Sequence, residues 1–117
     1  MLKDKVILVT GASRGIGQAT AVALAKAGAQ VVIHGRSEES IAETETAVSD
    51  VGLAPFKVIY DVTDEPAMKQ ATIAIKKQFG RLDGLVNNAG VMDEGLLGMV
   101  KTDVMQNMLN VNVTAVL

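Results

Sequence analysis

Apolar residues in this chain form short continuous runs, separated by stretches in which they recur every three or four positions. The runs at residues 6–9 and 31–33 contain only Val, Ile and Leu, and the segments 56–60 and 82–86 follow later in the chain. Continuous apolar runs bounded by charges or glycine are typical of parallel strands that are covered on both faces. We therefore predict four strands over these ranges.

Between the strands, the three- to four-residue spacing predicts helices whose apolar side chains share one face. Gly28 is expected to end the first helix as a left-handed cap, and Gly80 is expected to end the third helix. Ser37 is expected to cap the second helix, the third begins at residues 63–64, and a last helix is predicted over residues 101–117. The predicted inward-facing positions are Ile16, Thr20, Ala23, Leu24 and Ala27 in the first helix, Ile41, Val48 and Val51 in the second, and Ala67, Ala71, Ile75 and Phe79 in the third.

The order of these elements is strand and helix three times over, and then strand, loop and helix. Such alternation predicts an α/β fold in which right-handed crossovers place helices on both faces of a parallel sheet. A chain of 117 residues is long enough for one domain with one core. We therefore predict a single Rossmann-type, three-layer αβα domain over residues 1–117, with strand order 3-2-1-4, as in a truncated doubly wound fold.

The first strand runs into a glycine-rich turn, residues 10–17, with the sequence Thr-Gly-Ala-Ser-Arg-Gly-Ile-Gly. Between a strand and a helix, Gly11 permits a tight turn, Gly15 lets a pyrophosphate approach the backbone, and Gly17 lets the helix pack on the strand. The helix then directs its free N–H groups and positive dipole end at the phosphates. The alternative is a plain glycine-rich turn, which the strand–turn–helix context disfavours.

The spacing T-G-x-x-x-G-x-G in this turn resembles the signature of the short-chain dehydrogenase/reductase family, and three later segments agree with it. They are Asp-Val at residues 61–62, Asn-Asn-Ala-Gly at 87–90 and Val-Asn-Val at 111–113. The resemblance implies that the acidic residue meets adenine, that the Asn-Asn-Ala-Gly loop backs the cofactor ribose, and that Asn112 holds a water in the catalytic proton relay. The cofactor-binding residues that it implies are Gly11, Ser13, Arg14, Gly15, Ile16, Gly17, Gly35, Arg36, Ser37, Asp61, Val62, Asn88, Ala89, Gly90 and Val111, and the catalytic residue is Asn112.

The residues themselves leave other interpretations open. An alternative role for Asp61, at the carboxyl end of a strand, is to cap the next helix. Asn87 and Asn88 are also suitable turn residues, because asparagine tolerates left-handed backbone, and one side chain can tie strand ends together. Asn112 is a poor helix former, and its alternative role is that of an exposed helical residue. His34, the single histidine, is interpreted as structural.

The choice of cofactor follows from charge at the end of the second strand. Enzymes that prefer NAD place an acidic residue there for the ribose 2′-hydroxyl. Here Gly35 stands at that position and Arg36 follows it, while Arg14 adds a second positive charge in the glycine-rich turn. Two such charges suit a 2′-phosphate, so we predict NADP(H). The alternative is that both arginines are solvated surface residues.

The family's catalytic tyrosine, with a lysine four residues later, has no counterpart here. The only tyrosine is Tyr60, and the residue four positions on is Asp64. We therefore expect the 117-residue chain to be inactive by itself and to be the truncated product of a longer reductase for hydride transfer between NADPH and a carbonyl or alcohol. The alternative is a free-standing nucleotide-binding or assembly module without redox activity.

Composition narrows the remaining functional classes. A net charge of −2 with scattered Lys and Arg argues against a nucleic-acid surface, and the chain has no cysteine for disulfides or thiolate metal sites. No metal site is predicted. Neither a signal peptide nor a membrane span is apparent, so we expect a cytoplasmic protein. We also expect a homo-oligomer, joined through the exposed edge of strand 82–86 and the apolar helix 101–117.

Overall fold

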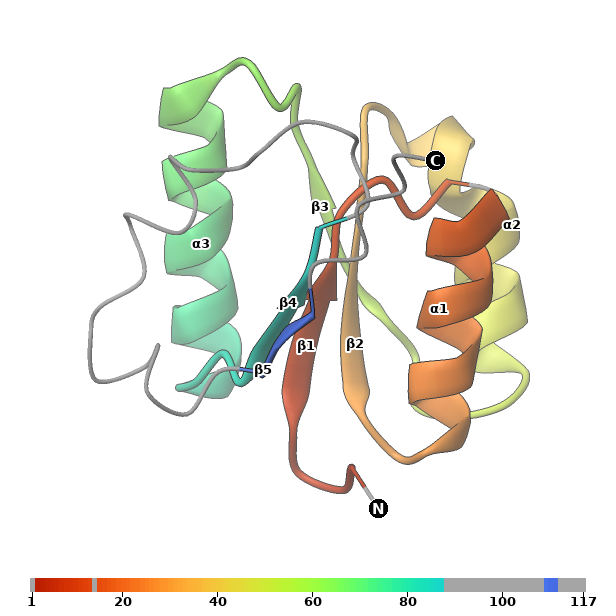
Figure 1. Ribbon diagram of the computed structural model, residues 1–117. Helices are drawn as coiled ribbons and strands as arrows, with labels where there is room; N and C mark the ends of the chain where they lie inside the picture. Colours follow the sequence, from red (N-terminus) through yellow and green to blue (C-terminus); the bar gives the residue numbers. More distant parts are fainter. Residues whose placement is uncertain (1, 14, 88–108, 112–117) are drawn as a thin grey trace.

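The computed structural model describes residues 2–13, 15–87 and 109–111 of the chain. Strands and helices alternate along it, as Figure 1 shows. The strands are β1 (Val6–Val9), β2 (Gln30–Gly35), β3 (Phe56–Ile59), β4 (Gly84–Val86) and β5 (Leu109–Val111), and the helices are α1 (Gly15–Lys26), α2 (Glu38–Ser49) and α3 (Glu65–Phe79).

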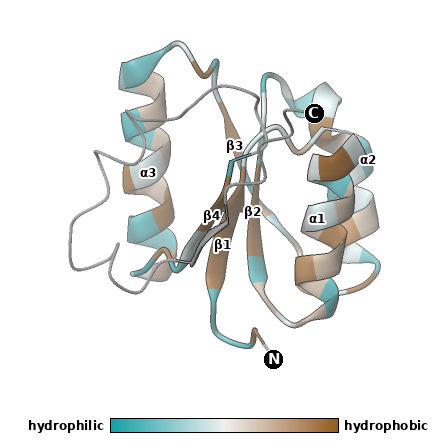
Figure 2. Cartoon of the chain, viewed as in Figure 1, coloured by the Kyte–Doolittle hydropathy of each residue, from teal (hydrophilic) through white to brown (hydrophobic). Residues whose placement is uncertain are grey.

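The strands form one parallel sheet in the order β3-β2-β1-β4-β5, so the predicted order 3-2-1-4 is confirmed and β1 lies in the interior. In Figure 1, α1 and α2 cover one face of the sheet and α3 covers the other. Alternate residues of the strands consequently enter two separate apolar cores. Leu8 and Val32 pack with Met68 and Ile75 on the α3 side, whereas Ile7 and Val31 pack on the α1 and α2 side. Figure 2 shows the hydrophobic strands between the two helical layers.

The ends of the helices follow the predicted local signals. Ser37 caps α2 by accepting a hydrogen bond from the backbone N–H of Ser40, whose side chain in turn accepts one from the backbone N–H of Ser37. Asp64 caps α3 through the backbone N–H of Ala67. Gly80 ends α3 in the left-handed region with φ 76°, where glycine avoids the strain of a Cβ. All three signals are local. The cap at Ser37 and the end at Gly80 were predicted from sequence, whereas the start of the third helix was predicted only to within residues 63–64.

Of the predicted inward face of α1, Leu24 is confirmed, partly buried against the core. The helix nevertheless packs mainly through a different face. Its buried residues are Gly17, Ala21 and Ala25, spaced four apart, whereas Ile16 is 42% exposed and Ala23 is exposed. Small side chains on this face let the helix lie close to the sheet, which favours dispersion contacts between the two layers. In α2, Thr44 joins Ile41 and Val48 in the buried set, and Val51 lies beyond the helix, 37% exposed. In α3 the buried residues are Met68, Thr72 and Ile75, with Ala67, Ala71 and Phe79 only partly buried.

The expectation for the fourth strand and the last helix is also corrected. β4 is not a sheet edge, because β5 pairs with it in parallel register, with Leu85 opposite Asn110. Residues 109–111, assigned by sequence to a helix, are in this strand. The remainder of the predicted helix 101–117 lies outside the described residues. The association surface predicted at the β4 edge is therefore wrong.

No helix in the described part of the chain is long and apolar enough to cross a membrane. The cytoplasmic location stays a prediction.

Candidate functional site

The glycine-rich turn follows β1 and begins α1. Gly11 and Gly15 have φ of 60° and 62°, in the left-handed region where a side chain would be strained. A Cβ at Gly15 would have no neighbouring atom within 4 Å, so packing does not explain this glycine. Because Gly15 has no side chain, a ligand can approach the backbone at the N-terminus of α1. Ser13 is half-buried, Ile16 is exposed at the same helix end, and Arg14 lies outside the described residues.

Long-range hydrogen bonds hold this turn in place. The backbone N–H of Ala12 donates to the carbonyl of His34 at 2.9 Å, and the backbone N–H of Gly11 donates to His34 Nδ1 at 3.0 Å. From α2, the Thr44 hydroxyl donates to the Ala12 carbonyl at 2.6 Å. The turn is therefore fastened both to β2 and to α2. These supports are distant in sequence from the turn itself.

Sequence reasoning missed Thr44. It lies between Ile41 and Val48 on the inward face of α2 and is fully buried. A hydroxyl at a core-facing helical position needs a hydrogen-bond partner, which was the available signal. Its carbonyl partner, 32 residues earlier, became evident only from the fold.

The end of β2 carries the residues that we assigned to cofactor choice. Gly35 is buried, and a Cβ there would meet Ile41 Cγ2 and, at 2.8 Å, Ser40 Oγ. The start of α2 therefore lies directly against this glycine. Arg36 and Ser37 follow it and are both exposed.

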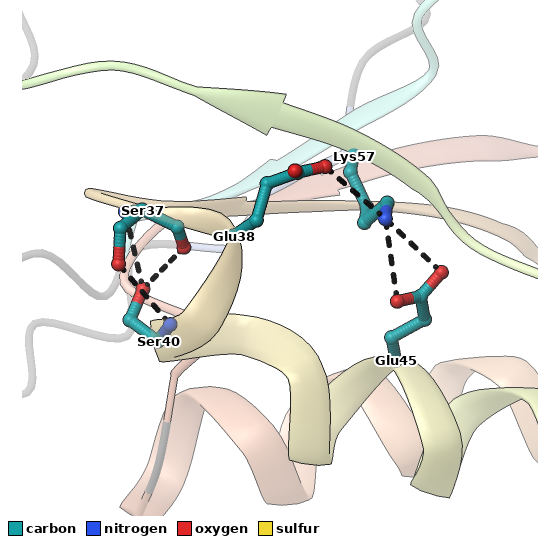
Figure 3. Close-up of polar contacts among 5 residues, drawn as sticks. All are labelled: Ser37, Glu38, Ser40, Glu45 and Lys57. Atoms are coloured by element: carbon teal, nitrogen blue, oxygen red, sulfur yellow. Dashed lines mark hydrogen bonds and ion pairs between the residues drawn. The ribbon is translucent and has the colours of Figure 1, made fainter.

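Two further contacts fix α2 beside the sheet (Figure 3). Lys57 of β3 forms ion pairs with Glu38 at 3.4 Å and Glu45 at 3.3 Å. Both partners are well exposed to solvent, so the ion pairs orient α2 more than they stabilise it. The same helix start carries the Ser37–Ser40 capping box. The backbone that follows Arg36 is thus held both by the capping box and by the ion pairs between Lys57 and α2.

Asp61, directly after β3 and Tyr60, is exposed. Its Oδ1 accepts hydrogen bonds from the backbone N–H of Thr63 at 2.9 Å and from the Thr63 hydroxyl at 2.7 Å. These bonds lower the pKa of the Asp61 carboxyl, and the positive charge of Arg36 acts in the same direction. Asp64 rather than Asp61 caps α3, so the capping alternative for Asp61 is wrong. Val62 is partly buried against the α3-side core.

Asn87 directly follows β4 and is buried. Its Oδ1 accepts a hydrogen bond from the Thr10 hydroxyl at 3.2 Å, which joins the ends of β4 and β1. This is the role of tying strand ends together that the sequence suggested. Asn88, Ala89 and Gly90 follow it outside the described residues.

The predicted catalytic residue, Asn112, also lies outside the described residues. Val111, predicted in a helix, instead ends β5, opposite Val86. The prediction that Val111 is helical is therefore wrong. It is in an extended strand, whose backbone groups pair with those of β4.

The structure brings most of the described candidates to one edge of the sheet. The glycine-rich turn, Arg36, Asp61 and Asn87 all follow the carboxyl ends of neighbouring parallel strands. In open parallel sheets, ligands bind outside this edge, close to the point where the strand order reverses. That point lies between β1 and β4, beside the turn. The described residues contain no group of three or more side chains arranged to hold a metal ion.

Comparison with known proteins agrees with this arrangement. The family described as short chain dehydrogenase matches residues 5–117. Gluconate 5-dehydrogenase of Gluconobacter oxydans is 38% identical over 109 residues, which cover 93% of this chain and 43% of that protein. A metagenomic short-chain oxidoreductase in complex with NADP superposes with a TM-score of 0.73 at 38% identity, over 77% of this chain and 41% of that one. NAD+-bound xylitol dehydrogenase superposes with a TM-score of 0.80 at 25% identity, over 93% of this chain and 53% of that one.

Proposed function

Because the chain belongs to the short-chain dehydrogenase family, we propose that it is the NADP(H)-binding portion of an oxidoreductase that transfers hydride between NADPH and a carbonyl or alcohol. The chain spans about half the length of the curated relatives that it matches, with 43% and 47% of two of them covered. Family membership favours this proposal over a stand-alone assembly module.

The observation that carries the choice of NADP is the pair Gly35 and Arg36. An acidic side chain at position 35 would hydrogen-bond the ribose 2′-hydroxyl of NAD. A Cβ at that position would require the Ile41 and Ser40 side chains to shift, so the packing here disfavours an acidic side chain. The next residue is an exposed arginine, which suits the additional phosphate of NADP.

Other described residues fit a dinucleotide at this edge. The open backbone at Gly15 and the N-terminus of α1 suit a pyrophosphate. Asp61, with its lowered pKa, carries a carboxylate beside the strand ends, where we place the adenine. The bound nicotinamide would supply the hydride, and this chain's residues would bind and orient it. Ser13, Ile16, Ser37 and Val62 are proposed to line the same nucleotide.

Calorimetric titration with NADPH and NADH tests the proposal. NADPH should bind more tightly, by a margin that narrows with added salt, because salt screens exposed charges. Arg36→Ala should reduce the margin by about 1–2 kcal/mol, roughly 5- to 30-fold in the ratio of dissociation constants. Lys77→Ala removes an exposed charge from the last turn of α3, at the opposite end of the helix from Asp61, and should leave the margin unchanged. Equal affinities of the unmodified chain for the two nucleotides would refute the choice of NADP.

A further inference from the structure

The single histidine of the chain sits between the glycine-rich turn and the end of β3. His34 is only 2% exposed, at the carboxyl end of β2. Its Nδ1 accepts the hydrogen bond from the Gly11 N–H at 3.0 Å, and its Nε2 lies 2.8 Å from the carbonyl oxygen of Tyr60. The ring also contacts the Tyr60 ring, with centroids 4.1 Å apart and the ring planes tilted by 37°. One side chain therefore joins residues that are far apart in sequence.

These two partners allow a single protonation state of the ring. A backbone N–H can only donate, so Nδ1 must be without a proton, and a carbonyl can only accept, so Nε2 must carry one. The neutral Nε2–H tautomer satisfies both contacts. A protonated ring would direct an Nδ1–H at the Gly11 N–H, and two donors would then face each other.

The surroundings favour the neutral ring. Burial lowers the pKa of His34, and the hydrogen bond to the Tyr60 carbonyl and the negative charge of Asp61 oppose this shift only in part. Asp61 belongs to the connection after β3 and itself interacts with the charge of Arg36 after β2. From α2, the neutral Thr44 binds the same turn through Ala12. From the turn, the Gly11 N–H binds the ring, and the Ala12 N–H binds the backbone carbonyl of His34.

We propose that His34 is a positioning residue for the glycine-rich turn, whose neutral imidazole orients the Gly11 amide and fastens the turn to the carboxyl end of β3. Nucleotide affinity then depends on a hydrogen-bond acceptor at the place of Nδ1. This last step rests on the proposed nucleotide-binding function. The orientation of the turn by His34 does not, because it is a property of the chain without nucleotide.

Nuclear magnetic resonance can test the contact directly. The chain has one histidine, so ring ¹⁵N signals of histidine-labelled protein come from His34 alone. We expect the Nε2–H tautomer at about pH 7, together with slow exchange of the Gly11 amide proton. On acidification, protonation of the ring should release the Gly11 amide while Leu8 in β1 stays protected. An Nδ1–H tautomer, or loss of protection at Gly11 only together with Leu8, would overturn the proposal.

Three substitutions separate the two hydrogen bonds. His34→Asn keeps an acceptor near the place of Nδ1, His34→Gln keeps a donor near the place of Nε2, and His34→Phe keeps only the aromatic contact with Tyr60. We expect NADPH affinity close to that of the unmodified chain for H34N, and roughly two- to tenfold weaker for H34Q and H34F, as for the loss of one hydrogen bond. Protection of the Gly11 amide should follow the same order.

The outcomes distinguish the two proposals. If H34N binds as weakly as H34F, or H34F binds as tightly as the unmodified chain, the positioning role of His34 is wrong. If the unmodified chain binds neither NADPH nor NADH, the proposed function is wrong. The tautomer and the exchange of the Gly11 amide would in that case still decide the role of His34.

Discussion

Asp83 shows how a single buried charge stabilises the amino end of the sheet. Its carboxylate accepts hydrogen bonds from the backbone N–H of Val6 at 2.8 Å and from Arg81 Nε at 2.7 Å, and its other oxygen pairs with the Arg81 guanidinium at 2.6 Å. Burial raises the pKa of Asp83, but the bonds from Arg81 and Val6 outweigh it and hold the pKa below its ordinary value. The side chain thus links β1 to the segment before β4.

Replacing Asp83 by Asn should lower the free energy of unfolding by about 1–3 kcal/mol near neutral pH, because the pair with Arg81 is lost. A carboxyl whose pKa is depressed on folding stabilises the protein above its unfolded pKa, and that contribution is lost as the pH falls through the folded value. Urea unfolding should therefore show the difference between the variant and the unmodified chain shrinking below about pH 4.

Asp50→Asn is the matched control, since Asp50 is exposed at the end of α2. It should change the free energy of unfolding by no more than about 0.5 kcal/mol at any pH. A loss for Asp83→Asn that persists unchanged at low pH would contradict the electrostatic explanation.

At the scale of elements, α2 packs closely against the end of β2 because Gly35 has no side chain. Gly35 is not one of the glycines with a positive φ, so its backbone conformation does not require glycine. Glycine is needed there because a side chain would collide with the start of α2. Ile41 Cγ2 and Ser40 Oγ occupy the volume that a Cβ would need. The packing of α2 thereby also disfavours an acidic residue at this position.

Gly35→Ala should lower the free energy of unfolding by about 1–3 kcal/mol, because the added methyl overpacks the start of α2. Ile41→Leu removes the Cγ2 atom that the methyl would meet. In a double-mutant cycle measured by urea unfolding, the loss in Gly35→Ala should be smaller when Ile41 is already Leu. Simple additivity of the two changes would show that the Gly35 contact with Ile41 does not limit packing there.

At the scale of the whole molecule, the 117-residue chain should not turn over substrate. Positioned proton transfer contributes about 10²–10⁴-fold to such reactions. The only tyrosine, Tyr60, is 5% exposed within the α3-side core, and Asp64 stands where the family's lysine would follow. Absorbance of the reduced nicotinamide should stay constant with any carbonyl substrate. Steady oxidation by protein freed of host reductases would contradict this expectation.

Self-association stays a prediction, with a changed physical basis. The outer strands of the described sheet are β3 and β5, and β4 is covered. Lys57, held by Glu38 and Glu45, places charge on the β3 strand, and charge discourages pairing at a sheet edge. We therefore expect copies to associate through the β5 side, with twofold symmetry. Light scattering at micromolar concentration should give at least twice the chain mass of 12.2 kDa, and a species of one chain mass would contradict it.

Sequence alone determined the features that depend on neighbouring residues. The apolar runs defined β1 and β2, Ser37 and Gly80 marked helix ends, and the glycine-rich turn located the candidate site, because each signal acts within a few positions. Tertiary structure decided which face of α1 meets the sheet, because close packing selected Ala21 and Ala25 over larger residues. It also decided that β5 covers β4. The contact between His34 and Gly11, separated by 23 positions, depends on the strands being side by side, and no local pattern encodes that.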